Sequence, residues 1–129
     1  MRLLVCGDRN WVDFEAVKRR IAELKPSVVI HGCARGADSL AEKAASEMGI
    51  PVLSFPADWV RFGKKAGYIR NGRMLYESKP DHVLVFHDDI EHSEGTADMV
   101  RRAKQAGITV ETCRHNRYMQ GYQELGGGG

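Results

Sequence analysis

The sequence predicts an α/β fold, a three-layer sandwich in which helices cover both faces of a mainly parallel, five-stranded sheet. Short apolar runs typical of buried strands alternate with longer segments whose apolar residues recur at helical spacing. A helical segment separates each strand from the next, as the right-handed crossovers of a parallel sheet require. Glycines follow several strands, at the edge where such sheets bind ligands. The expected strand order is the doubly wound 3-2-1-4-5.

The first half of the chain contains three predicted strands and two predicted helices. The run Arg2–Cys6 is almost entirely apolar and predicts a strand that is buried on both faces. Apolar residues at helical spacing then predict a helix over Phe14–Leu24, which ends before a proline. Val28–Ile30 is the second strand, and a glycine loop leads from it into a helix that reaches Met48. Val52–Phe55 is the third strand.

The second half repeats this alternation. A long connection leads to a predicted helix over Ala66–Tyr76, which is followed by the strand His82–Phe86. His87–Glu94 is polar and is expected to be a loop. Gly95-Thr96 opens a further helix, and Ile108–Thr112 is the fifth strand.

The size and composition of the chain indicate one folded domain. Its 129 residues, of which 43% are hydrophobic and 28% charged, are enough for a single hydrophobic core. We expect this domain over residues 1–113 and a C-terminal extension with a glycine tail over residues 114–129. Three widely spaced cysteines suit a reducing compartment, and the first apolar run is too short for a signal peptide or a membrane span, so we expect a cytoplasmic protein without a membrane partner.

The loop His31–Gly36 joins a buried strand to a helix and is the strongest local signal for a ligand. Gly32 and Gly36 let the backbone bend closely around a ligand, and a helix start favours anions such as phosphate. Arg35 adds a planar cation that binds phosphate with two hydrogen bonds. This pattern predicts a phosphate cradle. The alternative is an ordinary strand-to-helix turn in which Arg35 and Asp38 face solvent.

Four motifs in order, His31–Asp38, Pro56–Trp59, Gly67–Asn71 and Gly95-Thr96, resemble the YspA-like, YpsA-related branch of the SLOG superfamily. These Rossmann-like proteins are related to the LOG, or lysine-decarboxylase-like, enzymes and to the DNA-processing Smf proteins. The resemblance spans Leu3–Val110. It implies a nucleotide or nucleotide-derived, ADP-ribose-like ligand held by the glycine loops of a sensor or binding module. It also implies a homodimer, and it requires no further cofactor.

Two motifs of the LOG branch bear on catalysis. Its Arg-Lys-x-x-Met motif is matched by Arg70–Met74, with Asn71 at the position of the lysine. Its Gly-Gly-x-Gly-Thr-x-x-Glu motif keeps Gly95-Thr96 here, but Met99 stands where the catalytic glutamate belongs. The resemblance therefore implies that phosphate binding is retained and places hydrolysis in doubt. The alternative function is a LOG-type nucleotide N-glycosidase, or phosphoribohydrolase, whose catalytic residues would be Arg70, Asp98 and Asp58.

A second alternative is nucleic-acid binding through the basic run Arg61–Arg73, which the net charge of only +2 disfavours. We expect no metal site, because the polar segment His87–His92 lacks the spacing of a zinc motif. The predicted ligand-binding residues lie in the loops after the strands and in the helix over 66–76. They are Gly7, Asp8, Arg9, His31, Gly32, Arg35, Gly36, Asp38, Asp58, Trp59, Arg70, Asn71, Gly95 and Thr96.

Overall fold

The computed structural model describes residues 1–115, which form a single sheet with helices around it. The strands are β1 (Arg2–Gly7), β2 (Val28–His31), β3 (Val52–Ser54), β4 (His82–Phe86) and β5 (Thr109–Cys113). The helices are α1 (Phe14–Leu24), α2 (Ala37–Glu47), α3 (Trp59–Phe62), α4 (Ala66–Ser78) and α5 (Glu94–Gln105), with 3-10 turns η1 (Gly63–Lys65) and η2 (Ile90–His92). Apart from residues 114 and 115, the expected C-terminal extension lies outside the described residues.

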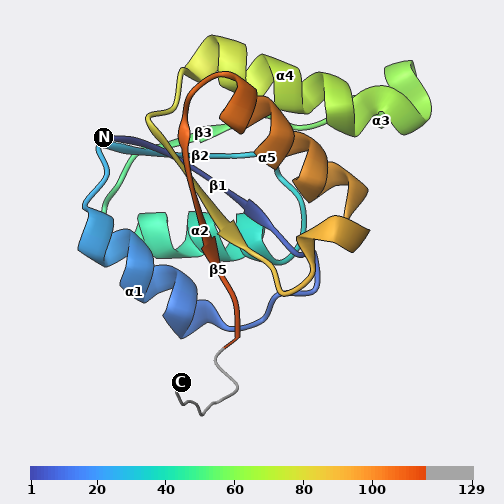
Figure 1. Ribbon diagram of the computed structural model, residues 1–129. Helices are drawn as coiled ribbons and strands as arrows, with labels where there is room; N and C mark the ends of the chain where they lie inside the picture. Colours follow the sequence, from blue (N-terminus) through green and yellow to red (C-terminus); the bar gives the residue numbers. More distant parts are fainter. Residues whose placement is uncertain (116–129) are drawn as a thin grey trace.

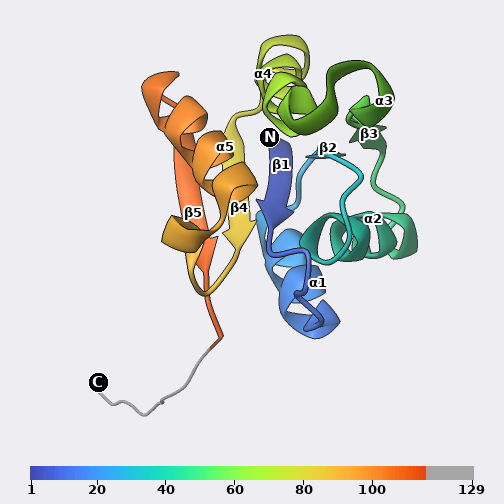
Figure 2. The same ribbon diagram turned by 90° about the vertical axis from the view of Figure 1, so that its right-hand side faces the viewer.

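The five strands are all parallel and follow the order β3-β2-β1-β4-β5. Helices α1 and α2 cover one face of the sheet and α4 and α5 cover the other, as Figures 1 and 2 show. The predicted fold class and strand order are therefore confirmed. Among residues 1–115, no helix combines the length and the apolar composition needed to cross a lipid bilayer.

The core consists of one apolar layer on each face of the sheet. Leu3 and Val5 of β1 pack on the side of α1 and α2, while Leu4 packs on the side of α4 and α5. This alternation follows from the two-residue period of a strand. Burial of one such leucine stabilises the fold by about 1.5–3 kcal/mol. The small buried residues Ala41 and Ala45 let α2 lie close to the sheet.

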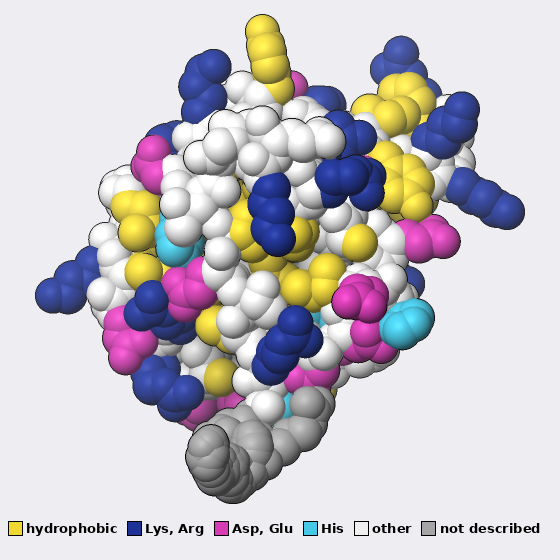
Figure 3. All heavy atoms as spheres, in the orientation of Figure 1, with side chains coloured by type: hydrophobic (Ala, Val, Ile, Leu, Met, Phe, Trp, Pro, Cys, Tyr) yellow, Lys and Arg dark blue, Asp and Glu magenta, His cyan; other side chains and the backbone are white. Residues whose placement is uncertain are grey.

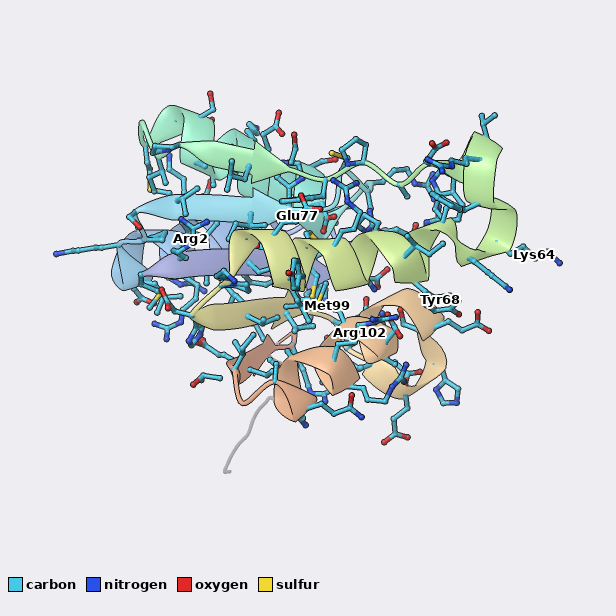
Figure 4. All side chains as sticks on the ribbon, turned by 90° about the horizontal axis from the view of Figure 1, so that it is seen from above. Arg2, Lys64, Tyr68, Glu77, Met99 and Arg102 are labelled. Carbon is cyan, nitrogen blue, oxygen red and sulfur yellow. The ribbon has the colours of Figure 1, made fainter. Side chains whose placement is uncertain are left out.

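The region between β3 and α4, which the sequence predicts only as a long connection, contains a short helix and a 3-10 turn. Asp58 accepts a hydrogen bond from the Arg61 N–H at 3.0 Å, and this cap starts the short helix α3. Helix α3 and turn η1 lie beyond the end of α4 and stand out from the body of the protein (Figures 1 and 4). In Figure 3, hydrophobic side chains gather there among lysines and arginines. The polar segment after β4 likewise contains an unpredicted element, the turn η2.

The reversal of strand order falls between β1 and β4 and opens a crevice at their carboxyl ends. Gly7 pairs with Phe86 across the two strands, and the Asp8 N–H donates to the Phe86 carbonyl at 2.8 Å. The chain then leaves β1 toward α1 on one face and leaves β4 toward α5 on the other (Figure 2). Since both connections turn away from this point, the space above it is left for a ligand.

Candidate functional site

A cleft of about 690 Å³ lies at this crevice, within the usual volume range of small-molecule sites. Its walls come from the loop after β1, from α4, and from the segment between β4 and α5, with α3 and η1 at the rim. Nine of the predicted ligand-binding residues line it: Gly7, Asp8, Arg9, Asp38, Trp59, Arg70, Asn71, Gly95 and Thr96. The structure brings these residues together from segments far apart in the sequence.

The start of α5 faces this cleft with free hydrogen-bond donors. Ser93 precedes the helix but forms no side-chain cap, and the N–H groups of Gly95 and Thr96 have no partner among residues 1–115. The space beside the Gly95 Cα is open. The Thr96 hydroxyl donates to the Gly7 carbonyl at 3.3 Å and so ties α5 to β1. Exposed donors at the positive end of a helix make this a favourable place for an anion.

In the loop after β2, three of the backbone donors are used inside the protein. The N–H groups of Gly32 and Ala34 donate to the Asp38 carboxylate at 3.0 and 3.2 Å. The Cys33 N–H donates to Nδ1 of His31 at 3.0 Å. The phosphate cradle predicted for this loop stays a prediction, and the start of α5 is a second place where an anion could bind.

The two glycines of the loop are explained by neighbouring protein atoms. A Cβ on Gly32 would lie 2.5 Å from Nη1 of Arg70, which donates a hydrogen bond to the Gly32 carbonyl. Gly36 has a φ of +71°, and a Cβ there would lie 2.2 Å from the Asp8 carbonyl oxygen. Neither glycine lines the cleft, and the exposed Arg35 is also outside its lining. The ligand-binding role predicted for Gly32, Arg35 and Gly36 stays a prediction.

Two further predicted residues have local partners away from the cleft lining. His31 is 2% exposed, and its Nε2 lies 2.6 Å from Oε1 of Glu42 on α2. Asp58 serves as the cap of α3. Both have protein partners in this structure, and the ligand contacts predicted for His31 and Asp58 stay predictions.

Asn71 connects the elements that surround the cleft. Its amide donates to the Gly95 carbonyl at 3.1 Å and to Oδ2 of Asp98 at 3.0 Å, and its Oδ1 accepts from Nε of Arg70 at 3.1 Å. Arg70 in turn binds the carbonyl of Gly32 in the β2–α2 loop. This buried chain of contacts fixes α4 relative to α5 and to that loop, so it holds the shape of the cleft.

Asp98 and Met99 are neighbours on α5 but lie in different environments. Met99 lines the cleft, and Figure 4 shows it between α5 and α4. The Asp98 carboxylate is buried outside the lining, where it bonds Arg101 at 2.6 Å and Arg102 at 2.8 Å. Successive helical residues point about 100° apart, which places the two side chains differently. Asp98 is therefore not positioned to act on a ligand.

Burial shapes the titration of two groups in the cleft wall. Burial raises the pKa of the Asp38 carboxyl, and hydrogen bonds from the loop and the nearby His31 and Arg70 oppose this rise. Burial also raises the pKa of the Cys6 thiol far above its usual value, and the charge of Asp38 adds to the effect. Cys6 is thus held as a neutral thiol and is not an activated nucleophile.

Several cleft residues were not predicted from the sequence, among them Tyr68, His87 and His92. Tyr68 donates to Glu94 at 3.0 Å and closes the space between α4 and α5 (Figure 4). The position of His87 immediately after a buried strand was the signal that could have identified it. Within residues 1–115, no three His, Cys, Asp or Glu side chains converge as a metal site would require.

An open parallel sheet with a ligand-sized cleft where its strand order reverses defines a Rossmann-like binding module. The sequence profile of the YspA, cpYpsA-related SLOG family matches residues 1–62. The Gene 61 protein of Mycobacterium phage D29 is 40% identical over 119 residues, which cover 84% of this chain and 93% of that protein. The chain belongs to the YspA, cpYpsA-related SLOG family.

Among solved structures, DNA processing protein A (DprA) from Streptococcus pneumoniae is similar, with a TM-score of 0.70 and 18% sequence identity. The match covers 92% of this chain and 52% of that chain, so this protein spans about half the length of DprA. At this level of identity the similarity supports the shared fold.

Proposed function

We propose that this protein binds a nucleotide or a nucleotide-derived, ADP-ribose-like ligand in the cleft between β1 and β4, as a sensor or binding module without a further cofactor. The observation that carries the proposal is the free N-terminus of α5, which faces a cleft of nucleotide size. The N–H groups of Gly95 and Thr96 suit a phosphate, and the exposed indole of Trp59 at the rim suits a base.

Binding without hydrolysis is favoured by the placement of the acidic side chains that the enzyme alternative needs. Catalysis of N-glycosidic cleavage requires a carboxylate that acts near the sugar. Met99 occupies the cleft wall at the relevant position of α5, while Asp98 is engaged by two arginines and Asp58 caps α3. A thioether neither carries charge nor transfers a proton. The cleft is therefore better suited to bind a phosphate than to catalyse bond cleavage.

The first test is mass spectrometry of small molecules released from the purified protein, followed by calorimetric titration with AMP, NAD and ADP-ribose. Lys64 lines the cleft and Lys65 does not, which provides a matched pair on the turn η1. Lys64→Ala is expected to weaken binding about fivefold, roughly 1 kcal/mol for a hydrogen bond to phosphate, while Lys65→Ala leaves it unchanged. If no nucleotide is found bound and none binds in the titration, the proposal is contradicted. Release of the free base, monitored by chromatography, would favour the enzyme.

A second candidate function, binding of single-stranded nucleic acid, is favoured by the surface of α3 and η1. Trp59 is 59% exposed and Phe62 is 37% exposed, and the Arg61 guanidinium lies 4.9 Å from the Phe62 ring centroid. Lys64 and Lys65 follow on the same surface. Alternating cations and exposed aromatic rings bind the backbone and stack on the bases of single strands. The net charge of +2 does not reflect this local concentration of cations and aromatic rings.

Fluorescence anisotropy with a labelled oligo-thymidine tests this second candidate. If three cations contact phosphates, a plot of the logarithm of the affinity against the logarithm of the salt concentration should have a slope of about −2. Trp59→Ala should weaken binding by about 1–3 kcal/mol, the usual value of one stacked base. No change in anisotropy at low salt would exclude this function.

The homodimer also remains a proposal, supported by apolar side chains on the outer side of α4 and β3. Ile69 is 37% exposed, Tyr76 is 79% exposed and Leu53 is 40% exposed, whereas Met74 of the same helix is buried. Covering these side chains in a second copy would remove apolar surface from water. Light scattering should give twice the monomer mass of 14.4 kDa, and Ile69→Glu should reduce it to that of the monomer.

A further inference from the structure

His87 is a buried histidine that follows β4 directly and lines the cleft. Its residue surface is 8% exposed. The Asp89 N–H donates to Nδ1 of its ring at 2.9 Å. A ring nitrogen that accepts a hydrogen bond carries no proton, so the neutral ring carries its proton on Nε2. The loop after β4 thus fixes which nitrogen of His87 is the donor.

The Nε2–H donor has no partner among residues 1–115. The ring nitrogen Nδ1 is the only side-chain atom of His87 with a hydrogen bond in this part of the chain. In a residue that is only 8% exposed, a donor without an acceptor costs free energy comparable to that of a lost hydrogen bond. Because the ring lines the cleft, an acceptor that enters the cleft would remove this cost.

The backbone places His87 beside the free donors of α5. Phe86, the preceding residue, pairs with Gly7, and the Thr96 hydroxyl donates to the Gly7 carbonyl. The end of β1 therefore pairs with the residue that precedes His87 and accepts a hydrogen bond from Thr96 at the start of α5. We propose that Nε2–H of His87 and the N–H groups of Gly95 and Thr96 together bind one phosphoryl group. This inference rests on the proposed function and adds a ligand-binding residue to it.

Two acidic side chains near this group, those of Asp89 and Glu94, have protein partners of their own. The carboxylate of Asp89 lies 2.7 Å from Nδ1 of His92, and the carboxylate of Glu94 accepts from Tyr68. Three neutral donors then face the phosphoryl oxygens. Neutral N–H groups at a helix start are sufficient to bind phosphate without an adjacent cation.

Two substitutions separate the roles of the two ring nitrogens. His87→Asn keeps an acceptor near the position of Nδ1 for the Asp89 N–H and has no atom at the position of Nε2. His87→Gln has an amide N–H that reaches the position of Nε2. His82→Asn is the matched control, since His82 lies at the opposite end of β4 and contacts Glu111.

Calorimetric titration with ADP-ribose, inorganic phosphate and adenosine is the test. We expect His87→Asn to weaken ADP-ribose and phosphate binding at least tenfold, His87→Gln to restore part of it, and His82→Asn to leave it unchanged. The affinity for adenosine, which has no phosphate, should be the same in all variants. Thermal unfolding verifies that each variant is folded.

Nitrogen NMR of the wild-type imidazoles supplies a readout independent of any variant. The spectrum should show Nε2 of His87 protonated in the free protein, and its resonance should shift when ADP-ribose is added. If His87→Asn binds ADP-ribose as tightly as the wild type does, or if ADP-ribose does not shift the Nε2 resonance, the role of His87 is overturned and the proposed function stays intact. Failure of the wild-type protein to bind ADP-ribose and phosphate would overturn both.

Discussion

Replacement of Asp98 by alanine removes the acceptor that joins α4 to α5 beneath the cleft. Its carboxylate is 4% exposed and accepts from the buried amide of Asn71 at 3.0 Å. A hydrogen bond to a charged group contributes about 1.5–3 kcal/mol. The ion pairs with Arg101 and Arg102 add less, because these arginine side chains are 60% and 38% exposed and pairs one helical turn apart contribute about 0.3–0.5 kcal/mol each. We therefore expect Asp98→Ala to lower the free energy of unfolding by about 2–3 kcal/mol.

Urea denaturation at neutral pH, followed by circular dichroism, measures this loss. In a thermal scan it corresponds to a decrease in Tm of roughly 8–12 °C, at about 4 °C per kcal/mol for a domain of this size. Asp98→Asn retains an acceptor for Asn71 and should lose about 1 kcal/mol or less. Arg102→Ala should cost less than about 0.5 kcal/mol. The reasoning is refuted if Asp98→Asn is as destabilising as Asp98→Ala, or if Arg102→Ala costs as much as either.

Three further predictions test the loops and the sheet. Gly36→Ala should destabilise the protein by more than about 2 kcal/mol in urea titrations, and Gly49→Ala by only about 1 kcal/mol. Both glycines have positive φ, but only at Gly36 would a Cβ collide with backbone atoms. Equal losses would contradict the close contact. Gly95→Val should abolish nucleotide binding in calorimetry and leave the circular dichroism spectrum unchanged, because the space beside it is open to a ligand and free of protein atoms; normal binding would remove α5 from the site. The pKa of Glu111 is lowered chiefly by its hydrogen bonds from Arg20, so its folded pKa lies below its unfolded value. Its stabilisation is therefore fully present above pH ~4.5 and is lost as the pH falls through the folded pKa. Glu111→Gln should lower stability at pH 7 by about 1 kcal/mol, and this difference should shrink in urea titrations at acidic pH; a difference independent of pH would contradict the assignment.

Whether an element of the fold could be predicted depends on whether the interactions that form it leave a local pattern in the sequence. The strand at Arg2–Cys6 was predicted because an apolar run has one favourable environment, the interior of a parallel sheet. The helices at Phe14–Leu24 and 66–78 were predicted within two residues because their apolar side chains must share one face. Helix α3 was not predicted, because four residues stabilised by one capping bond leave no periodic pattern.

The candidate site was predicted in outline because strand order alone brings certain loops together. Once β1 and β4 are neighbours, the segments after Gly7 and before Gly95 must converge at the same end of the sheet. The site residues that lie outside the cleft lining are mostly engaged by other protein atoms. Gly32 and Gly36 have the composition of a phosphate loop, but they make room for Arg70 and for the Asp8 carbonyl.

The sequence alone therefore determined the layers, the strand order and the edge that holds the cleft, since these depend on hydrophobic periodicity and chain connectivity. Only the tertiary structure decided which donors remain free to bind a ligand. Asp38 folds back onto the loop after β2 and accepts from the N–H groups of Gly32 and Ala34, whereas no side chain caps the start of α5. Nδ1 of His87 accepts a loop N–H, which leaves its Nε2–H for the cleft. The physical reason is that a hydrogen bond requires two atoms about 3 Å apart, often from residues remote in sequence, and residue spacing does not encode such distances.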